Sequence, residues 1–571
     1  MKKVISALLI VSMIAAMFVV GVSAVEGTAI NTAEEFAAIT GEGKYYLAAD
    51  ITLTATNENE FTGTLDGNGK TITTSVPVFA KAGGTIKNLT IAGEVTGKAV
   101  LVLDTAAALN LEKCTNNANV TNSGSAMGTF VGTVSHDLSI KNCVNNGNVT
   151  STSNNGCGGF IGSTAADGVK VTVEGSKNTG NVEGPTQASG FIALPKNAIV
   201  VIRNCVNEGN INAIKNKKNY TVAAGFIGRA QATDKTGATA SFTIENCKNT
   251  GTLSSVGQYA GGMAAWIDMG KVSIKDCINT GDVSASHRVG GIIGNVGTGE
   301  SYQAYEITGC VNSGKISGGE RIGGIIGCVY GQGNRTTERV AAGTCQYAVI
   351  NNCINLGEIV NTNDANVGQI IGHQDSECLV LKNCIAAGKI TLGEESKGRA
   401  VVVGCSGEIM IGGERTLSDG TTKETTPGCD IDNLYIIEND GTTWFSKYKA
   451  DEMPCDCTLA DYMAMADKAG DIIIVSADKL ASGEVAYALN QAIGKDVFFQ
   501  TIGTDKVPTL DSSSKKVIKD GDKYANETAP VNPPVNPPVN PRTGDEVLVW
   551  VVALVVSAIG ACVVIRRKEE L

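Results

Sequence analysis

The sequence is poor in aromatic and charged residues. Phe, Trp and Tyr make up 5% of its 571 residues, and Asp, Glu, Lys and Arg together make up 18%. A compact enzyme domain usually needs more large side chains to fill its core, whereas a thin array of small residues does not. The formal net charge of -11 and the lack of a basic stripe argue against nucleic acid as a partner.

Histidine is also scarce, with only His136, His287 and His373 in the chain. None of them belongs to a His-Glu-x-x-His motif, which excludes a zinc protease of that type. A nucleophilic Gly-x-Ser-x-Gly in a strand-turn-helix context and a nucleotide-binding glycine loop are absent as well. The sequence indicates no cofactor, no metal site and no catalytic residue.

The N-terminus has the layout of a secretory signal. Lys2 and Lys3 precede an apolar stretch from Val4 to Val20, and small residues end at Ala24. This pattern predicts a signal peptide over 1–24 and a mature chain that begins at Val25. The alternative is a first membrane helix.

The C-terminus combines a proline-rich stretch, an apolar run and a basic tail. Residues 526–543 favour an extended polyproline II spacer, and Val547–Ile565 is an apolar run of 19 residues, enough to cross a bilayer. Arg566, Arg567 and Lys568 follow, as expected for a cytoplasmic end. We therefore expect a transmembrane segment and basic tail over 544–571.

This C-terminal layout resembles the cell-wall sorting signal of Gram-positive surface proteins. The pentapeptide is Asn540-Pro541-Arg542-Thr543-Gly544, with Asn540 where the family usually has leucine, so the sortase class stays open. The resemblance implies cleavage between Thr543 and Gly544 and covalent attachment of Thr543 to peptidoglycan by a sortase. The alternative is a plain membrane anchor. Both interpretations place the bulk of the protein outside the cell.

Between these ends, a Cys-x-Asn phrase recurs at steps of 29 to 43 residues. The cysteine position is occupied by Cys114, Cys143, Ser176, Cys205, Cys247, Cys277, Cys310, Cys353 and Cys384. A period in this range indicates a stacked repeat architecture. Within one period, "KVSIKDC", "GDVSA" and "VGGIIGNV" have the character of three short strands, and no helical period separates them. We therefore predict an all-β fold, a right-handed parallel β-helix of about 30-residue coils.

Stacked coils align equivalent residues into ladders. The expected inward aliphatic ladder contains Ile140, Ile202, Ile244, Ile274 and Ile307, and the expected amide ladder contains Asn145, Asn178, Asn207, Asn249, Asn279, Asn312 and Asn355. The glycine that follows in Asn-x-Gly is expected to supply the positive φ angle of a tight corner.

The eight ladder cysteines are predicted to pack as small buried hydrophobes. Disulfides are an alternative in a secreted chain, although ladder neighbours about 4.8 Å apart lie too far for the usual bridge. Zinc ligation or catalysis has little support, since the one close pair is Cys455-Asp456-Cys457. Better disulfide candidates are the cysteines outside the ladder: Cys345, Cys378, Cys429, Cys455 and Cys457.

The Gly-Gly-x-x-Gly phrases at 158–162, 290–294 and 323–327 resemble the GLUG motif of bacterial surface proteins, which also occurs beside some immunoglobulin A proteases. The segment from Ile30 through "FTGTLDGNGKTI" resembles the leading part of the same protein type. This resemblance covers about Ile30 to Cys405. It implies the architecture of this part of the chain but almost nothing about its activity. We expect capping coils over 25–109 and the repeats over 110–429.

Residues 430–525 differ in composition and contain the one convincing helical stretch. Ser482 is positioned to cap a helix from Glu484 to Ile493, with Ala486, Leu489 and Ala492 on one face. Because a β-helix needs its open end covered, a small α+β cap is the first interpretation. A separate ligand-binding module is the second.

One variable position precedes each Gly-Gly corner. It is Tyr259, Arg288, Arg321 and, in a further coil, Asn366. Either this is a solvated face with a local bridge to Glu320, or Arg288 and Arg321 form an anionic-ligand subsite with Tyr259 as an exposed stacking platform. We expect an adhesin or surface-display rod that binds a host or dietary glycan or protein. The alternatives are a β-helix polysaccharide lyase or glycoside hydrolase, whose active site different coils would assemble, and a purely structural wall protein.

Overall fold

The structure is a computed structural model. It describes residues 26–122, 126–152, 156–215, 221–233, 239–297, 305–329, 348–362, 367–374, 379–392, 400–403, 413–416, 422–425, 430–437 and 472–527. The chain divides into two units, 1–526 and 527–571, and the elements below belong to the first.

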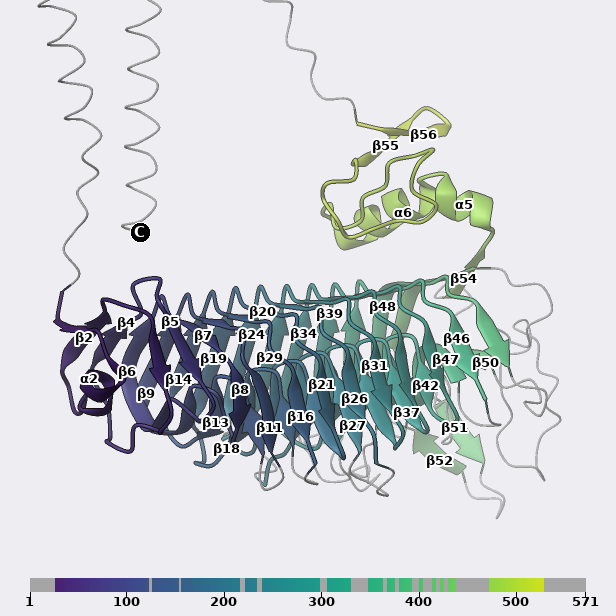
Figure 1. Cartoon of the computed structure of the whole chain (residues 1–571). Helices are drawn as coiled ribbons and strands as arrows, with labels where there is room; N and C mark the ends of the chain where they lie inside the picture. The colour runs from purple at the N-terminus through teal and green to yellow at the C-terminus, as the bar shows by residue number, and fades with distance from the viewer. Residues whose placement is uncertain are drawn as a thin grey trace, which may run out of the picture. The chain divides into compact units, whose positions relative to one another are not determined.

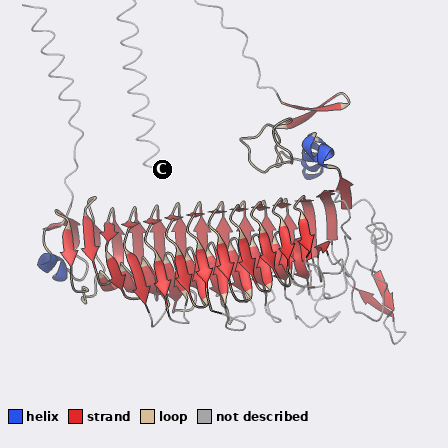
Figure 2. Ribbon diagram, turned by 45° about the vertical axis from the view of Figure 1, so that its right-hand side comes forward, coloured by secondary structure: helices blue, strands red, loops and turns tan. Residues whose placement is uncertain are grey.

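The first unit is built on a parallel β-helix, in which each strand pairs with its equivalents one coil away (Figure 1). One coil contains β34 (Lys271–Lys275), β35 (Ile278–Asn279), β36 (Val283–Ala285), β37 (Arg288–Gly290) and β38 (Ile293–Val296). Figure 2 shows the resulting stack of strands (red) side by side. The predicted fold class is confirmed.

Each central coil has five short strands where the sequence suggested three. The first predicted strand ends at Lys275, before Asp276, which has a φ of 53°, and β35 follows as an additional strand. The third predicted strand is broken between Gly290 and Ile293. Strands equivalent to β36 form a separate ten-stranded parallel sheet among the described residues. The other strands of the coil join one larger sheet.

The core consists of ladders of apolar side chains, among them an isoleucine ladder and a phenylalanine ladder. The predicted isoleucine ladder is in register, since Ile244 pairs with Ile202 and Ile274, and all of its members are buried. A second ladder was not predicted: Phe160, Phe191 and Phe226 stack with ring centroids 4.6 and 4.8 Å apart. Such stacked ring pairs stabilise the folded core beyond the effect of burying their apolar surface.

The asparagine ladder is confirmed and extends further than predicted. Asn249 donates through Nδ2 to Oδ1 of Asn279 at 2.8 Å, and Asn279 donates in turn to Asn312 at 2.8 Å. The ladder begins at Asn116 and ends where Asn355 donates to Oε1 of Gln369 at 2.9 Å. Each central amide also donates to the carbonyl two residues later, so the buried side chain is fully satisfied.

The role predicted for the Asn-x-Gly glycine is wrong. None of these glycines has a positive φ; the left-handed residue is the one before each cysteine, such as Asn142, Asn246 or Asp276. Asparagine and aspartate tolerate this conformation better than most residues. Glycine follows the asparagine because a Cβ on Gly281 would collide with the carbonyl oxygen of Gly251 in the preceding coil.

The second glycine of each Gly-Gly pair makes room for the asparagine ladder. A Cβ on Gly291 would collide with the side chain of Asn312, and a Cβ on Gly324 with that of Asn355. The Gly-Gly motif and the Cys-x-Asn motif therefore pack directly against each other in the interior of the β-helix.

The described helices are α2 (Ala33–Ala37), α5 (Ala477–Ala481) and α6 (Glu484–Ile493). Helix α6 confirms the predicted span, but its N-cap is Gly483, and Ala492 is exposed where a buried face was expected. Ser482 Oγ still accepts a hydrogen bond from the backbone N–H of Glu484 at 3.3 Å. The sequence did not indicate α2, which is too short for a periodic pattern.

The boundary expected at residue 430 does not end the β-helix. Strand β53 (Asp430–Ile437) pairs with β48 (Leu379–Ala386), and β54 (Ile472–Val475) pairs with β53. The small module that follows contains α5, α6 and the hairpin of β55 (Val517–Asp520) and β56 (Lys523–Asn526). Its apolar side chains, such as Leu480 and Leu489, pack with Ile354 and Ile385. Each of these isoleucines directly follows a ladder cysteine, and the two lie on successive coils. The module thus covers the side of the last coils.

Candidate functional site

The glycines of Gly-Gly-x-x-Gly bring two strands of each coil close together. A Cβ on Gly290 would collide with the carbonyl oxygen of Ile293, and a Cβ on Gly327 with the backbone of Val289. Side chains two positions before the Gly-Gly pair and one position after the last glycine can meet across this line, which we call the seam.

The seam has two columns of side chains in register. The first column contains Tyr259, which pairs with Arg288, and Arg321 follows because Val289 pairs with Ile322. The second column runs along the strands after the glycines and contains Arg229, Trp266, Asn295, Cys328 and His373. Residues seven apart in the sequence, such as Tyr259 and Trp266, face each other across the seam.

Aromatic rings and guanidinium groups form one chain of contacts in the seam. The rings of Tyr259 and Trp266 stack with centroids 4.5 Å apart. The guanidinium carbon of Arg229 lies 3.9 Å from the centroid of Trp266, and that of Arg288 lies 5.0 Å from the centroid of Tyr259. Arg288 Nη1 also donates to the Tyr259 hydroxyl at 2.6 Å. Cation–π contacts of this kind strengthen when they are shielded from water.

The seam carries more positive than negative charge. Arg229 forms an ion pair with Asp268 at 3.1 Å, in which the two side chains are 13% and 9% exposed. Burial raises the pKa of Asp268, and the Arg229 charge opposes that rise. Arg288 and Arg321 add two further guanidinium groups. Among the described residues, no ion pair joins Arg321 to Glu320, so the predicted bridge is not formed.

Arg321 has an unusual backbone conformation. Its φ is 53°, in the left-handed region, which asparagine, aspartate and glycine adopt more readily than arginine. Such a conformation costs about 1–3 kcal/mol and is found often at functional sites. This strain makes Arg321 distinct from the other members of its column.

The predicted ligand face is correct in its register and wrong in the exposure of Tyr259. Arg288 and Arg321 occupy equivalent positions and are partly exposed, as expected. Tyr259 is only 4% exposed because Trp266 covers its ring, so it offers no open stacking platform. Burial also raises the pKa of the Tyr259 hydroxyl. Asn366 lies outside the described residues.

Arg229, Trp266 and Asp268 were not predicted from the sequence. Trp266 had a usable signal: it is one of three tryptophans, and it follows Tyr259 by seven residues across a Gly-Gly pair. Arg229 follows the equivalent glycine of the preceding coil. The spacing becomes informative only once the two strands are known to lie back to back.

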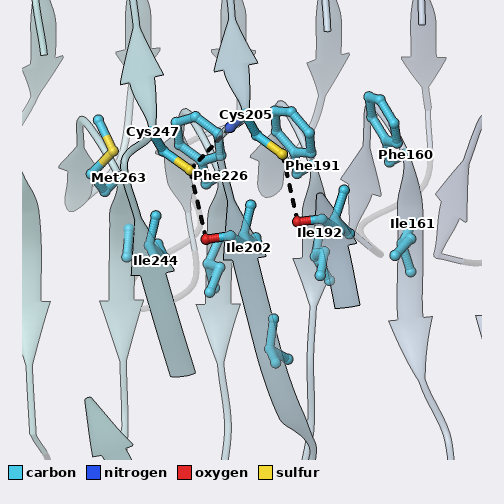
Figure 3. Close-up of a cluster of buried hydrophobic side chains, with 14 of the residues drawn as sticks. Phe160, Ile161, Phe191, Ile192, Ile202, Cys205, Phe226, Ile244, Cys247 and Met263 are labelled. Carbon is cyan, nitrogen blue, oxygen red and sulfur yellow. Dashed lines mark hydrogen bonds between the residues drawn. The ribbon is translucent and has the colours of Figure 1, made fainter. Parts of the chain in front are cut away.

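All eight ladder cysteines are buried, with exposures of 0 or 1%, and all are free thiols. Figure 3 shows Cys205 and Cys247 with the phenylalanine and isoleucine ladders, and Cys247 Sγ donates to the carbonyl of Ile202 at 3.6 Å. Burial raises the pKa of Cys277, Cys310 and Cys353 well above the ordinary value of a thiol. At these three positions the thiols stay neutral, so they fill space and are poor nucleophiles.

Several predicted features fall outside the described residues. They include the sorting pentapeptide 540–544, the apolar run 547–565 and the disulfide candidates Cys345, Cys378, Cys429, Cys455 and Cys457. In the part of the chain that is described, no helix has the length and apolar character needed to span a membrane.

Comparison with protein-family models and with curated protein sequences gives no match. Among solved structures, the chain is similar to a crystal structure provisionally described as an immunoglobulin A1 protease from Bacteroides ovatus. The identity is 11%, and the match covers 86% of this chain and 93% of that chain with a TM-score of 0.24. A likeness at this level does not indicate a shared function. The class of this protein therefore follows from its own structure: it is a parallel β-helix repeat protein with an arginine–aromatic seam.

Proposed function

We propose that this chain is an extracellular protein, anchored to a Gram-positive cell wall, that binds an acidic glycan at the seam of its β-helix. The observation that carries the binding proposal is the charge of the seam. Three guanidinium groups, from Arg229, Arg288 and Arg321, lie within four successive coils, and Asp268 forms an ion pair with the first of them.

Acidic glycans fit this arrangement better than neutral ones. Guanidinium groups bind carboxylate and sulfate groups through paired, charge-assisted hydrogen bonds. Arg288 and Arg321 are partly exposed and one coil apart, about 4.8 Å, so their mutual repulsion falls when an anion lies between them. Arg229 and Arg288 are already oriented by the stacked rings, which lowers the entropy lost on binding.

The binding test uses the full chain, purified in detergent, and immobilised hyaluronan, polygalacturonate and chondroitin sulfate, with dextran as the uncharged control. We expect at least one acidic polymer to bind, and the double variant Arg288→Gln/Arg321→Gln to bind at least about tenfold more weakly. The loss of two charge-assisted hydrogen bonds accounts for this factor.

The matched control is Arg203→Gln. Arg203 lies outside the seam, where its Nε donates to Glu245 on the surface at 2.8 Å, and its loss should leave binding unchanged. Equal weakening by both variants, or binding of dextran alone, would contradict the proposal. The same samples are assayed for released oligosaccharides, since release would identify the enzyme alternative.

Wall anchoring rests on the signal peptide, the proline-rich spacer and the pentapeptide 540–544. In a Gram-positive host with a matching sortase, the native chain should leave the cell mainly after digestion of peptidoglycan. The variant Thr543→Ala should remain in the membrane fraction, because the bond that sortase would cleave is altered. If both forms fractionate with the membrane, the chain is a plain membrane protein and the anchoring proposal is wrong.

A further inference from the structure

A second candidate site lies in the N-terminal coils, where the surface has a cavity of about 410 Å³. Its walls include Pro77 and Leu103 on the apolar side and Asp104 and Thr133 on the polar side. Asp104 lies on β9 (Val102–Glu112), and Thr133 on β13 (Val131–Val134), where the two residues are register partners. The volume is within the usual range for sites that bind small ligands.

The carboxylate of Asp104 has an unused acceptor in this cavity. Its Oδ1 is buried and accepts no hydrogen bond from the described residues. Lys98 lines the same cavity and Lys81 is the register partner of Asp104, yet among the described residues neither forms an ion pair with it. A buried carboxylate oxygen without a donor costs free energy, which the Asp104 side chain would recover by turning toward a ligand that brings a hydroxyl donor.

The remaining lining indicates an uncharged ligand. One carboxylate and one ammonium group, from Asp104 and Lys98, leave the lining without net charge, unlike the arginine cluster of the seam. Thr96, Thr133 and Asn122 add hydroxyl and amide groups that both donate and accept. Pro77 and Leu103 add apolar surface to the lining.

We propose that this cavity binds one uncharged sugar ring. A pyranose has the matching chemistry, because its C–H face packs on apolar side chains and its hydroxyl edge donates to carboxylates and accepts from hydroxyls and amides. In this arrangement a sugar hydroxyl donates to the carboxylate of Asp104, and the C–H face lies on Pro77 and Leu103.

The cavity is separate from the arginine cluster but on the same strand column. The column runs from Asp104 through Thr133, Ser163 and Leu194 to the position of Arg229. Four coil steps correspond to about 19 Å. The sugar site therefore does not rest on the acidic-glycan proposal, and the two can fail independently.

The test is saturation-transfer NMR on the full chain in detergent with the methyl glycosides of glucose, galactose, mannose and N-acetylglucosamine. We expect saturation transfer to at least one of them, and at least a tenfold weaker response with Asp104→Leu, which removes the acceptor and fills the cavity. Thr133→Val is the second variant; it removes one hydroxyl with little change of shape and should also weaken the response.

The matched control is Glu112→Gln, at the exposed end of the same strand, which should bind as the native chain does. The seam variant Arg288→Gln/Arg321→Gln should also keep the sugar response, whatever its effect on acidic polymers. The proposal is overturned if none of the four glycosides responds, or if the response survives both Asp104→Leu and Thr133→Val in variants whose circular dichroism matches the native chain.

Discussion

Gly281→Ala should destabilise the β-helix by about 3 kcal/mol or more. The added Cβ would collide with the carbonyl oxygen of Gly251 and approach Nδ2 of Asn249, both held in place by the neighbouring coil. Overpacking in a core usually costs roughly 1–3 kcal/mol, and here the backbone cannot move away without breaking the hydrogen bonds between coils. Urea unfolding, followed by far-ultraviolet circular dichroism, measures the change.

The control for this substitution is Gly168→Asn. Gly168 has a φ of 72° and nothing close to its Cβ position, and asparagine tolerates this conformation. Its free energy of unfolding should change by less than about 1 kcal/mol. If Gly281→Ala is as mild as this control, the close approach of successive glycines is not what selects glycine after the ladder asparagine.

Asn279→Ala should have an effect of similar size for a different reason. Three buried hydrogen bonds are lost at once: those from Asn249 to Asn279, from Asn279 to Asn312 and from Asn279 to the carbonyl of Gly281. The groups left behind stay buried, and each unsatisfied group costs roughly 1–3 kcal/mol. We expect a loss of about 3 kcal/mol or more in the free energy of unfolding.

The matched comparison is Asn212→Ala. Asn212 lies on the outward face of β26 (Ile211–Ala213), where its side chain reaches solvent. Removing it should change the free energy of unfolding by less than about 0.5 kcal/mol. Similar losses for Asn212→Ala and Asn279→Ala would show that the amide ladder contributes nothing specific. Unfolding in several steps, as repeat arrays can show, would be seen as separate transitions in the same experiment.

Much of the coil could be predicted because stacking turns a sequence repeat into a spatial ladder. The positions of the isoleucine, cysteine and asparagine ladders followed directly from the aligned phrases, and Ser176 occupies the cysteine position as predicted. Sequence alone could not locate the left-handed corner. Gly281 and Asp276 both suit a turn, and only the backbone shows that Asp276 has the positive φ while Gly281 is needed for close approach.

The binding site was less predictable than the fold. Arg288 and Arg321 could be found because they occupy a fixed position of the repeat at which the residue type varies from coil to coil. Their partners in the second column, Trp266 and Arg229, come from a different strand of the coil, and the exposure of Tyr259 depends on that strand. The cavity beside Asp104 left no pattern in the sequence, since its walls come from several coils.

The sequence by itself determined the class of this protein: a β-helix of about 30-residue coils with buried thiol and amide ladders, because a one-dimensional repeat dictates which residues stack. Only the tertiary structure decided where function can lie. The glycines of Gly-Gly-x-x-Gly bring two strands of the same coil back to back, so Tyr259, Trp266 and the arginines meet across the seam. Contacts across a coil depend on how sharply the backbone bends, and the repeat period does not encode that angle.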